Sequence, residues 1–265
     1  TITTANSAAS GDPFTHVVAG TGATWTYQTS AGIGGTVGAQ LAVGSTSSYL
    51  RLAASGTDGR RGVARRTFIW GGTNGALAPL LDIRTEVSVT TSLGDLHIRT
   101  SGQLEVRVGN STYLSASRHT IPSTGTYHVE LAITSSSADG ANDGKIEYRL
   151  YAADGTSLLH AWSSAYDQPV SYSPPSHARF SMMTTGGMDG YDRLDNVQAL
   201  FTDDLTAWIG PYVDSRVLPA PVPTLSSVTI PTTPGSSTGS ITVSWPKIVD
   251  PDLENYEIHL APGLD

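Results

Sequence analysis

Four aromatic residues in the second half of the chain are the candidates for ligand contact. Trp162, Tyr166, Tyr172 and Tyr191 lie in or beside segments rich in Ser, Pro, Gly and Asp, which favour loops. A flat ring exposed in a loop can stack on a sugar ring, while a nearby Asp or Asn binds hydroxyl groups. Aromatic residues are only 8% of the chain, however, and most Trp and Tyr residues pack into cores. Sugar binding and core packing are thus both open for each of the four.

A second candidate is the acidic segment at residues 139–144, where Asp139, Asn142 and Asp143 could offer oxygen ligands to Ca²⁺. The spacing of a calcium loop is not met, because Leu150 occupies the position of its bidentate glutamate. Asp-Gly and Asn-Asp sequences favour turns, so the segment is interpreted as a hairpin tip. We expect no metal site and no cofactor.

The histidines show no metal-ligand spacing such as His-x-His or His-x-x-x-His. They are His16, His97, His119, His128, His160, His177 and His259. The chain has no cysteine, which excludes a thiolate zinc site, a cysteine nucleophile and a disulfide framework. Asp192 and Asp195 would point to opposite faces of a strand, so they are not a catalytic pair.

Four arginines fall within seven residues: Arg60, Arg61, Arg65 and Arg66. They could meet an acidic glycan or a partner protein. The favoured interpretation is a solvated sheet edge, whose charges prevent pairing with another edge.

These residues must be positioned by strands, because apolar residues recur at every second position and turn residues separate the segments. The clearest expected strands are residues 48–54, 62–70, 82–91, 96–99, 103–108, 126–134, 145–151, 157–162, 178–184 and 190–201. Turns are expected at residues 93–95 and 101–102, and weaker strands at residues 14–18 and 25–28. Ten to twelve strands are too many for one flat sheet, so two sheets packed face to face are predicted.

The last strong strand, residues 190–201, closes the first domain. Its polar residues Asp195 and Asn196 favour a bend or a local hydrogen bond, and their expected role is to end a strand or to bond a neighbouring loop. After it, Pro219, Pro221 and Pro223 predict a stiff spacer. The expected organisation is a β domain at residues 1–212, a linker at 213–223 and a partial β module at 224–265.

Charge and hydropathy exclude two classes of partner. The formal net charge is -8 and the pI is about 5.2, whereas a general nucleic-acid binder needs a positive field. The longest apolar stretches are far shorter than the roughly 20 residues that span a bilayer. Nucleic-acid binding and membrane insertion are therefore not expected.

The closing strand resembles that of the laminin-G and concanavalin-A-like jelly-roll superfamily. The matching residues are Gly190, Asp192, Leu194, Asp195, Asn196, Val197 and Leu200. The resemblance implies an all-β, two-sheet jelly-roll sandwich. Hydrolytic members of the superfamily carry Glu-x-Asp-x-x-Glu on one strand, and this motif is absent here. No catalytic residue is thus expected, and the chain is predicted not to be an enzyme.

The residues after the jelly roll resemble two further patterns. Ser244-Trp245-Pro246, Asp250-Pro251-Asp252 and Tyr256-Glu257-Ile258 look like the first strands of a fibronectin type III domain. A jelly roll, Trp208-Ile209-Gly210-Pro211-Tyr212, a proline spacer and such a module together resemble minor tail proteins of long-tailed actinobacterial phages.

This second resemblance implies an extracellular virion protein of the phage tail that contacts other tail proteins and a host cell-envelope glycan. A homo-oligomer is expected, a trimer being one arrangement, because weak glycan sites gain from multivalency. Two alternatives stay open: a carbohydrate-binding module of a secreted glycosidase, and a purely architectural virion domain.

Overall fold

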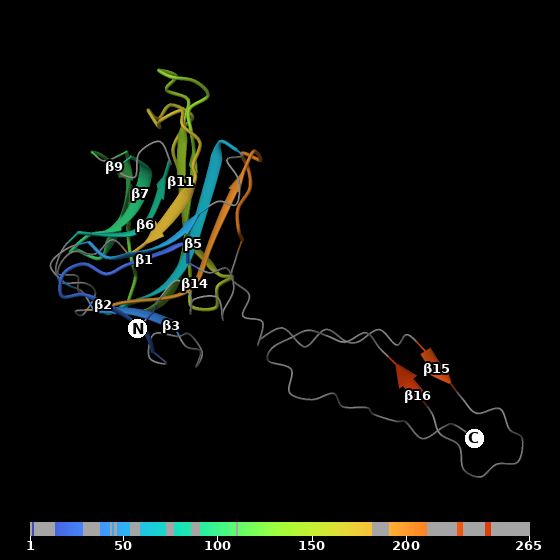
Figure 1. The fold of residues 1–265 in the computed structure, drawn as a ribbon. Coiled ribbons are helices and arrows are strands. Elements are labelled where there is room, and N and C mark those ends of the chain that lie inside the picture. Colours follow the sequence, from blue (N-terminus) through green and yellow to red (C-terminus); the bar gives the residue numbers. More distant parts are fainter. Residues whose placement is uncertain are drawn as a thin grey trace, which may run out of the picture. The chain divides into compact units, whose positions relative to one another are not determined.

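The computed structural model shows an all-β jelly-roll sandwich (Figure 1). The described residues are 2, 14–28, 38–42, 44, 47–53, 59–72, 77–85, 91–109, 111–181 and 191–210, together with two short strands at 227–229 and 242–244. The chain divides into two compact units, Thr1–Tyr212 and Val213–Asp265.

The sandwich consists of two seven-stranded antiparallel sheets. Sheet A has the order β1 (His16–Val18), β4 (Tyr49–Ala53), β13 (His177–Phe180), β6 (Ala78–Arg84), β7 (Ser92–Ile98), β8 (Gln103–Val108) and β9 (Thr112–Thr120). Sheet B has the order β12 (Leu158–Ser163), β11 (Lys145–Tyr151), β10 (Gly125–Thr134), β5 (Arg61–Trp70), β14 (Tyr191–Thr202), β3 (Gly38–Ala42) and β2 (Thr24–Gln28). The predicted fold class of the first domain is confirmed.

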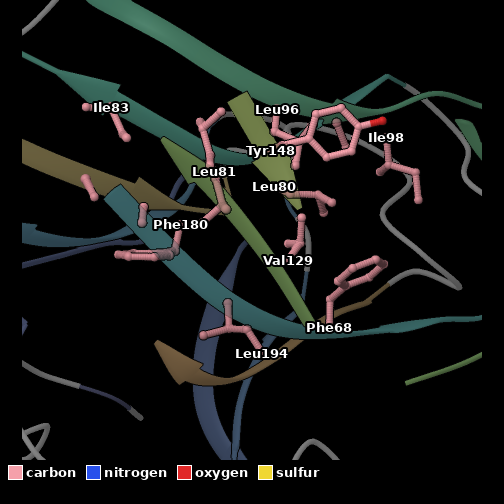
Figure 2. Close-up of a cluster of buried hydrophobic side chains, with 14 of the residues drawn as sticks. Phe68, Leu80, Leu81, Ile83, Leu96, Ile98, Val129, Tyr148, Phe180 and Leu194 are labelled. Carbon is pink, nitrogen blue, oxygen red and sulfur yellow. The ribbon is translucent and has the colours of Figure 1, made fainter. Parts of the chain in front are cut away.

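The core lies between the inner faces of the two sheets (Figure 2). Leu81 and Phe180 come from sheet A, and Phe68 and Val129 from sheet B; all four are fully buried. Successive side chains of a strand point to opposite faces, so the apolar residues at alternate positions meet in one layer. Burial of this layer is the main source of stability for the fold.

A buried ion pair joins the neighbouring strands β5 and β14 of sheet B. Arg66 and Asp192 are both fully buried, and the guanidinium donates to the carboxylate at 3.0 Å from Nη1 and 2.5 Å from Nη2. Arg66 Nη1 also donates to Ser181 Oγ at 2.8 Å, and Ser181 Oγ donates to Asp192. Buried charges are tolerated when they are paired and hydrogen-bonded in this way. The first Asp of the jelly-roll signature therefore has a structural role.

The strand predicted to close the first domain is confirmed as β14. Its adjacent polar residues Asp195 and Asn196 lie at a bulge. Its register with β5 shifts between Asp195 and Gln198. Asn196 has a positive φ of 50°, and its N–H donates to Asp195 Oδ1 at 2.8 Å. Asn tolerates the left-handed region better than most residues. The polar pair thus bends the strand without ending it.

The turn predicted at Leu93-Gly94-Asp95 is wrong, because these residues lie inside β7, which pairs with β6 and β8. A Cβ at Gly94 would lie 2.8 Å from Ile146 Cδ1 and 2.9 Å from Ile133 Cδ1. The glycine is needed for the close approach of sheet B and not for a turn. The sequence also missed β3 and β9; β9 is mostly polar and has little apolar alternation.

In the second unit, β15 (Ser227–Thr229) pairs with β16 (Thr242–Ser244) in antiparallel register. The proline spacer and Trp245, Tyr256 and Ile258 of the fibronectin-like pattern lie outside the described residues. The fibronectin-like assignment stays a prediction.

Candidate functional site

The outer face of sheet A carries a continuous row of charged side chains. Leu50, Leu81, Ile83, Leu96, Val106, Ala178 and Phe180 point into the core, so the residues between them point outward. The strand register places the outward residues Arg51, Arg179, Asp82, Asp95 and Arg107 opposite one another from β4 to β8. We call this set the charged row.

The acidic centre of the row is held by ion pairs. Arg84 Nε donates to Asp82 Oδ2, and Ser92 Oγ donates to Asp82 Oδ1 at 2.6 Å. Arg107 Nε donates to Asp95 Oδ2 at 3.1 Å. Burial raises the pKa of Asp82, the Arg84 charge opposes this shift, and the neighbouring Asp95 charge adds to it. The negative charges of Asp82 and Asp95 are therefore balanced by arginines on the same face of sheet A.

At the β4–β13 end of the row, positive charges gather around a buried histidine. His177 has no exposed surface, and its Nε2 has no hydrogen-bond partner among the described residues. Burial, together with the charges of Arg51, Arg179 and Arg84, lowers the pKa of His177 to about 3. The pKa of Arg179 is lowered by burial and by Arg84. We call these three arginines and His177 the arginine cluster.

The arginine cluster is bordered by aromatic and half-buried side chains. The Arg179 guanidinium lies 4.2 Å from the centre of the Tyr49 ring, an arrangement that fixes its direction by a cation–π contact. Arg51 and Tyr49 are half-buried, and His16, which is opposite Arg51 on β1, is exposed. The cluster therefore meets solvent on its β1–β4 side.

The predicted aromatic residues do not form one group. Trp162 lies near the end of β12, is half-buried and packs against the core near Tyr148 at a ring distance of 6.3 Å. Tyr166 and Tyr172 are exposed, at 50% and 54% of their surface. Lys145 Nζ lies 4.8 Å from the Tyr166 ring centre. Tyr191 begins β14, and its side chain is outside the described residues. A ligand role for these four stays a prediction.

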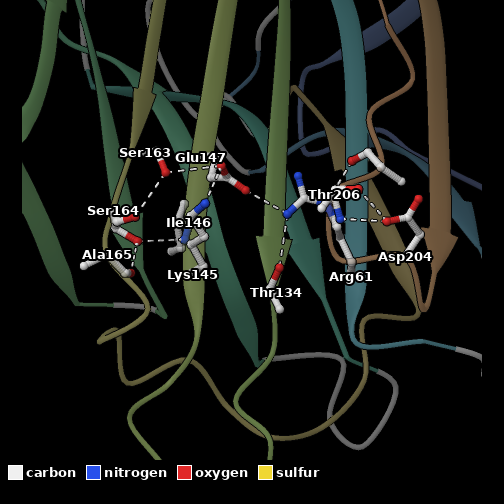
Figure 3. Close-up of polar contacts among 11 residues, drawn as sticks. Arg61, Thr134, Lys145, Ile146, Glu147, Ser163, Ser164, Ala165, Asp204 and Thr206 are labelled. Atoms are coloured by element: carbon white, nitrogen blue, oxygen red, sulfur yellow. Dashed lines mark hydrogen bonds and ion pairs between the residues drawn. The ribbon is translucent and has the colours of Figure 1, made fainter.

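The interpretation of the arginines at residues 60–66 as a solvated edge is wrong. β5 is a central strand between β10 and β14, and Arg61, Arg65 and Arg66 are buried. Arg61 donates to Thr134 Oγ1 at 3.1 Å and to Glu147 Oε2 at 2.8 Å on the outer face of sheet B (Figure 3). Internal acceptors make these charges structural.

The segment after β14 covers Arg61 and Arg65 on the outer face of sheet B. Arg61 Nε donates to the Ala207 carbonyl at 2.8 Å, and Arg65 Nη1 donates to the Gly210 carbonyl at 2.5 Å. The Trp208 ring lies 5.2 Å from the Arg61 guanidinium and 3.9 Å from that of Arg149. The chain is therefore fixed to sheet B as far as Gly210, and the outer face of sheet A is the better candidate for a ligand.

The acidic segment at residues 139–144 forms the turn between β10 and β11, as predicted. Asp143 Oδ1 accepts from the Ser137 N–H at 2.7 Å, and hydrogen bonds with Ser137 lower the pKa of Asp143. Within the described residues, no group of three or more His, Cys, Asp or Glu could hold a metal ion. No helix in that same part of the chain is long and apolar enough to cross a membrane.

No family model matches the sequence, and no curated protein is significantly similar to it. The likeness to solved structures is one of fold. An endo-β-1,4-glucuronan lyase from the fungus Trichoderma reesei matches with a TM-score of 0.50 and 12% identity, over 71% of this chain and 91% of that one. The cellulose-induced protein Cip1 matches with a TM-score of 0.46 and 14% identity, over 69% and 87%. The CBM2 module of the evolved Dit of Lactobacillus casei BL23 phage J-1 matches with a TM-score of 0.42 and 12% identity, over 70% and 81%.

The charged row was not predicted from the sequence, although each strand contains its signal. Arg51 lies between two leucines, Asp82 between Leu81 and Ile83, and Arg179 between Ala178 and Phe180. A charge between two core residues points away from the core. Only the strand order shows that these outward charges are neighbours.

Proposed function

We propose that this chain is a structural and adhesion protein of a phage tail that binds carbohydrate on the host cell envelope. Support comes from the sequence order of jelly roll, proline spacer and second β module, which resembles minor tail proteins. The two-sheet sandwich of the first unit fits that order. The protein would then act outside the cell, as part of the virion, beside other tail proteins.

The observation that carries the binding proposal is the arginine cluster on sheet A. Arg51 and Arg179 are opposite one another on neighbouring strands, and like charges in this position destabilise a sheet. Arg179 also has Asp82 opposite it on β6 and the Tyr49 ring beside it, so the half-buried Arg51 is the arginine of the cluster within reach of a polar ligand. Sugar ligands suit such a face because they present many hydrogen-bonding groups, which arginine forks can bind.

We propose binding without catalysis. Asp82, Asp95 and Glu105 are the buried carboxylates on the outer face of sheet A among the described residues, and each is paired with an arginine. A general acid needs a proton to donate, and a nucleophilic carboxylate needs access to the substrate. Ion-paired buried carboxylates meet neither condition well.

A glycan array probed with the purified full chain tests this proposal. Because single glycan sites are weak, the chain is presented both in its native oligomeric state, measured by light scattering, and clustered on beads. We expect binding to a subset of cell-envelope glycans. No binding above background in the clustered form would refute adhesion and leave an architectural role.

A further inference from the structure

We propose that β12 pairs edge to edge with β12 of a second copy of this chain, so that the two copies share one continuous sheet. This inference goes beyond the proposed function and does not depend on it. β12 spans Leu158–Ser163 and is an edge strand of sheet B. An edge strand is a template for pairing with another strand, because one side of it presents backbone N–H and C=O groups that have no ladder partner.

The open backbone groups of β12 belong to alternate residues. The ladder between β11 and β12 continues past Ser163, where the Ser164 N–H donates to the Ile146 carbonyl at 2.9 Å. In an antiparallel ladder, hydrogen-bonded residues alternate with residues whose N–H and C=O groups point the other way. Ser163 and Ala161 are therefore the residues that point away from β11. Within the described part of the chain, no backbone hydrogen bond joins them to a segment other than β11.

The other three edge strands of the described sandwich, β1, β2 and β9, are each protected. β1 has three residues, and its Val18 carbonyl accepts from Trp25 Nε1 at 3.0 Å. β2 is covered at Trp25, whose carbonyl accepts from the Ile2 N–H at 2.9 Å. The register of β9 with β8 is irregular, and β9 carries the exposed Arg118. Short length, covering contacts, irregular register and charge are the devices that keep sheet edges from pairing.

The side chains of β12 are apolar or small, and none of them is an Asp, Glu, Lys or Arg. Leu158 and Leu159 expose 53% and 42% of their surface, and Ala161 is also exposed. The irregularity of the ladder with β11 falls at this leucine end, whereas residues 160–163 pair regularly. β12 therefore combines an apolar, uncharged edge with a regular backbone, the combination that favours association with another strand.

Charge favours a second copy as the occupant. The formal net charge is -8, so two copies repel one another over most of their surface. This repulsion is weakest along β12, because the neighbouring Lys145 and Glu147 on β11 pair with each other at 2.9 Å (Figure 3). Antiparallel pairing about a two-fold axis is self-complementary, and it places no like charges opposite one another on the two strands.

The length of β12 sets the strength of the pairing. Its six residues extend over about 20 Å. The shared area therefore lies at the small end of protein interfaces, where complexes are weak and transient. We expect a dimer that forms at high protein concentration. Salt should strengthen it, because added ions screen the repulsion between two negatively charged copies.

Sedimentation equilibrium of the full chain, from about 1 μM to about 1 mM, tests the inference. We expect a monomer at the low end, a dimer at the high end, and at least about twofold tighter association when NaCl is raised from about 50 mM to about 500 mM. A monomer at every concentration would overturn the proposal and leave the edge to a strand of another protein. A trimer would also overturn it, because one edge that pairs with itself closes at two copies. Weaker association at high salt would point to charged contacts and have the same consequence.

Two substitutions at Ala161 locate the contact. Ala161→Pro removes the outward N–H at the middle of the edge, and proline is tolerated on edge strands. Ala161→Lys brings like charges together across the two-fold axis. Each should weaken association by at least about tenfold. Thermal denaturation shows whether each variant is folded, and the lysine variant decides the question if the proline variant does not fold.

Ser115→Lys is the matched control. It adds the same charge at an exposed position of β9, the edge strand of the opposite sheet. Its association should stay within about twofold of that of the unchanged protein. Equal association of the folded Ala161 variants and the unchanged protein would place the contact elsewhere and overturn the proposal. An equally large loss in Ser115→Lys would do so too, because the effect would then come from net charge and not from the β12 edge.

Discussion

Removal of the charge of Asp192 should destabilise the first unit more than any surface substitution. In Asp192→Asn the side chain keeps its shape, but the Arg66 guanidinium, which is fully buried, loses its only acidic hydrogen-bond partner among the described residues. An uncompensated buried charge costs about 3–5 kcal/mol. Since whole domains are stable by roughly 5–15 kcal/mol, this is a large fraction of the total.

Urea unfolding at pH 7, followed by tryptophan fluorescence, measures the free energy of unfolding. Asp195→Asn is the control on the same strand, and we expect it to cost less than about 1 kcal/mol. The double variant Arg66→Met with Asp192→Leu should recover most of the loss, because apolar replacement of a whole buried pair is often neutral. Two results would refute the role of the ion pair. One is a loss of unfolding free energy below about 1 kcal/mol in Asp192→Asn; the other is a loss in the double variant equal to the sum of the losses in its two single variants.

Three further predictions concern histidine ionisation, packing and the segment after β14. The folded-state pKa of His177 is about 3, below the usual value near 6.5, so only the unfolded state gains a proton as the pH falls from 7 to 5. Protonation of the unfolded state lowers the free energy of unfolding by about 2 kcal/mol at pH 5. Urea midpoints measured at pH 7 and pH 5 should therefore fall less in His177→Gln than in the unchanged protein. An equal fall in both proteins would contradict the lowered pKa of His177. Gly94→Val should lower the thermal midpoint, since the added side chain meets Ile146 and Ile133 and overpacking costs about 1–3 kcal/mol; an unchanged midpoint would argue against close packing there. Trp208→Ala should lower the free energy of unfolding by about 1–2 kcal/mol, because the ring contacts with Arg61 and Arg149 are lost. Thermal denaturation should show a smaller loss in Trp208→Phe, which keeps an aromatic ring. Equal stability of the two variants and the unchanged protein would show that the ring does not hold the segment.

Local pattern was sufficient to predict the fold class and many strands. β11 was predicted with the bounds observed, and its inward residues Ile146, Tyr148 and Leu150 are fully buried. Alternation has this power because side chains of a strand point to opposite faces with a period of two residues. The same rule failed where glycine or polar residues occupied a strand, as at Gly94 in β7 and throughout β9.

The sequence by itself determined that charged residues lie between apolar ones in several strands, and so that they face away from the core. Only the tertiary structure decided which of them meet. Arg51 and Arg179 are far apart in the chain but opposite one another in the sheet. Arg66 on β5 forms its ion pair with Asp192 on β14 because these two strands are neighbours. The physical reason is that side-chain direction is a local property of a strand, whereas strand order depends on contacts between distant segments of the chain.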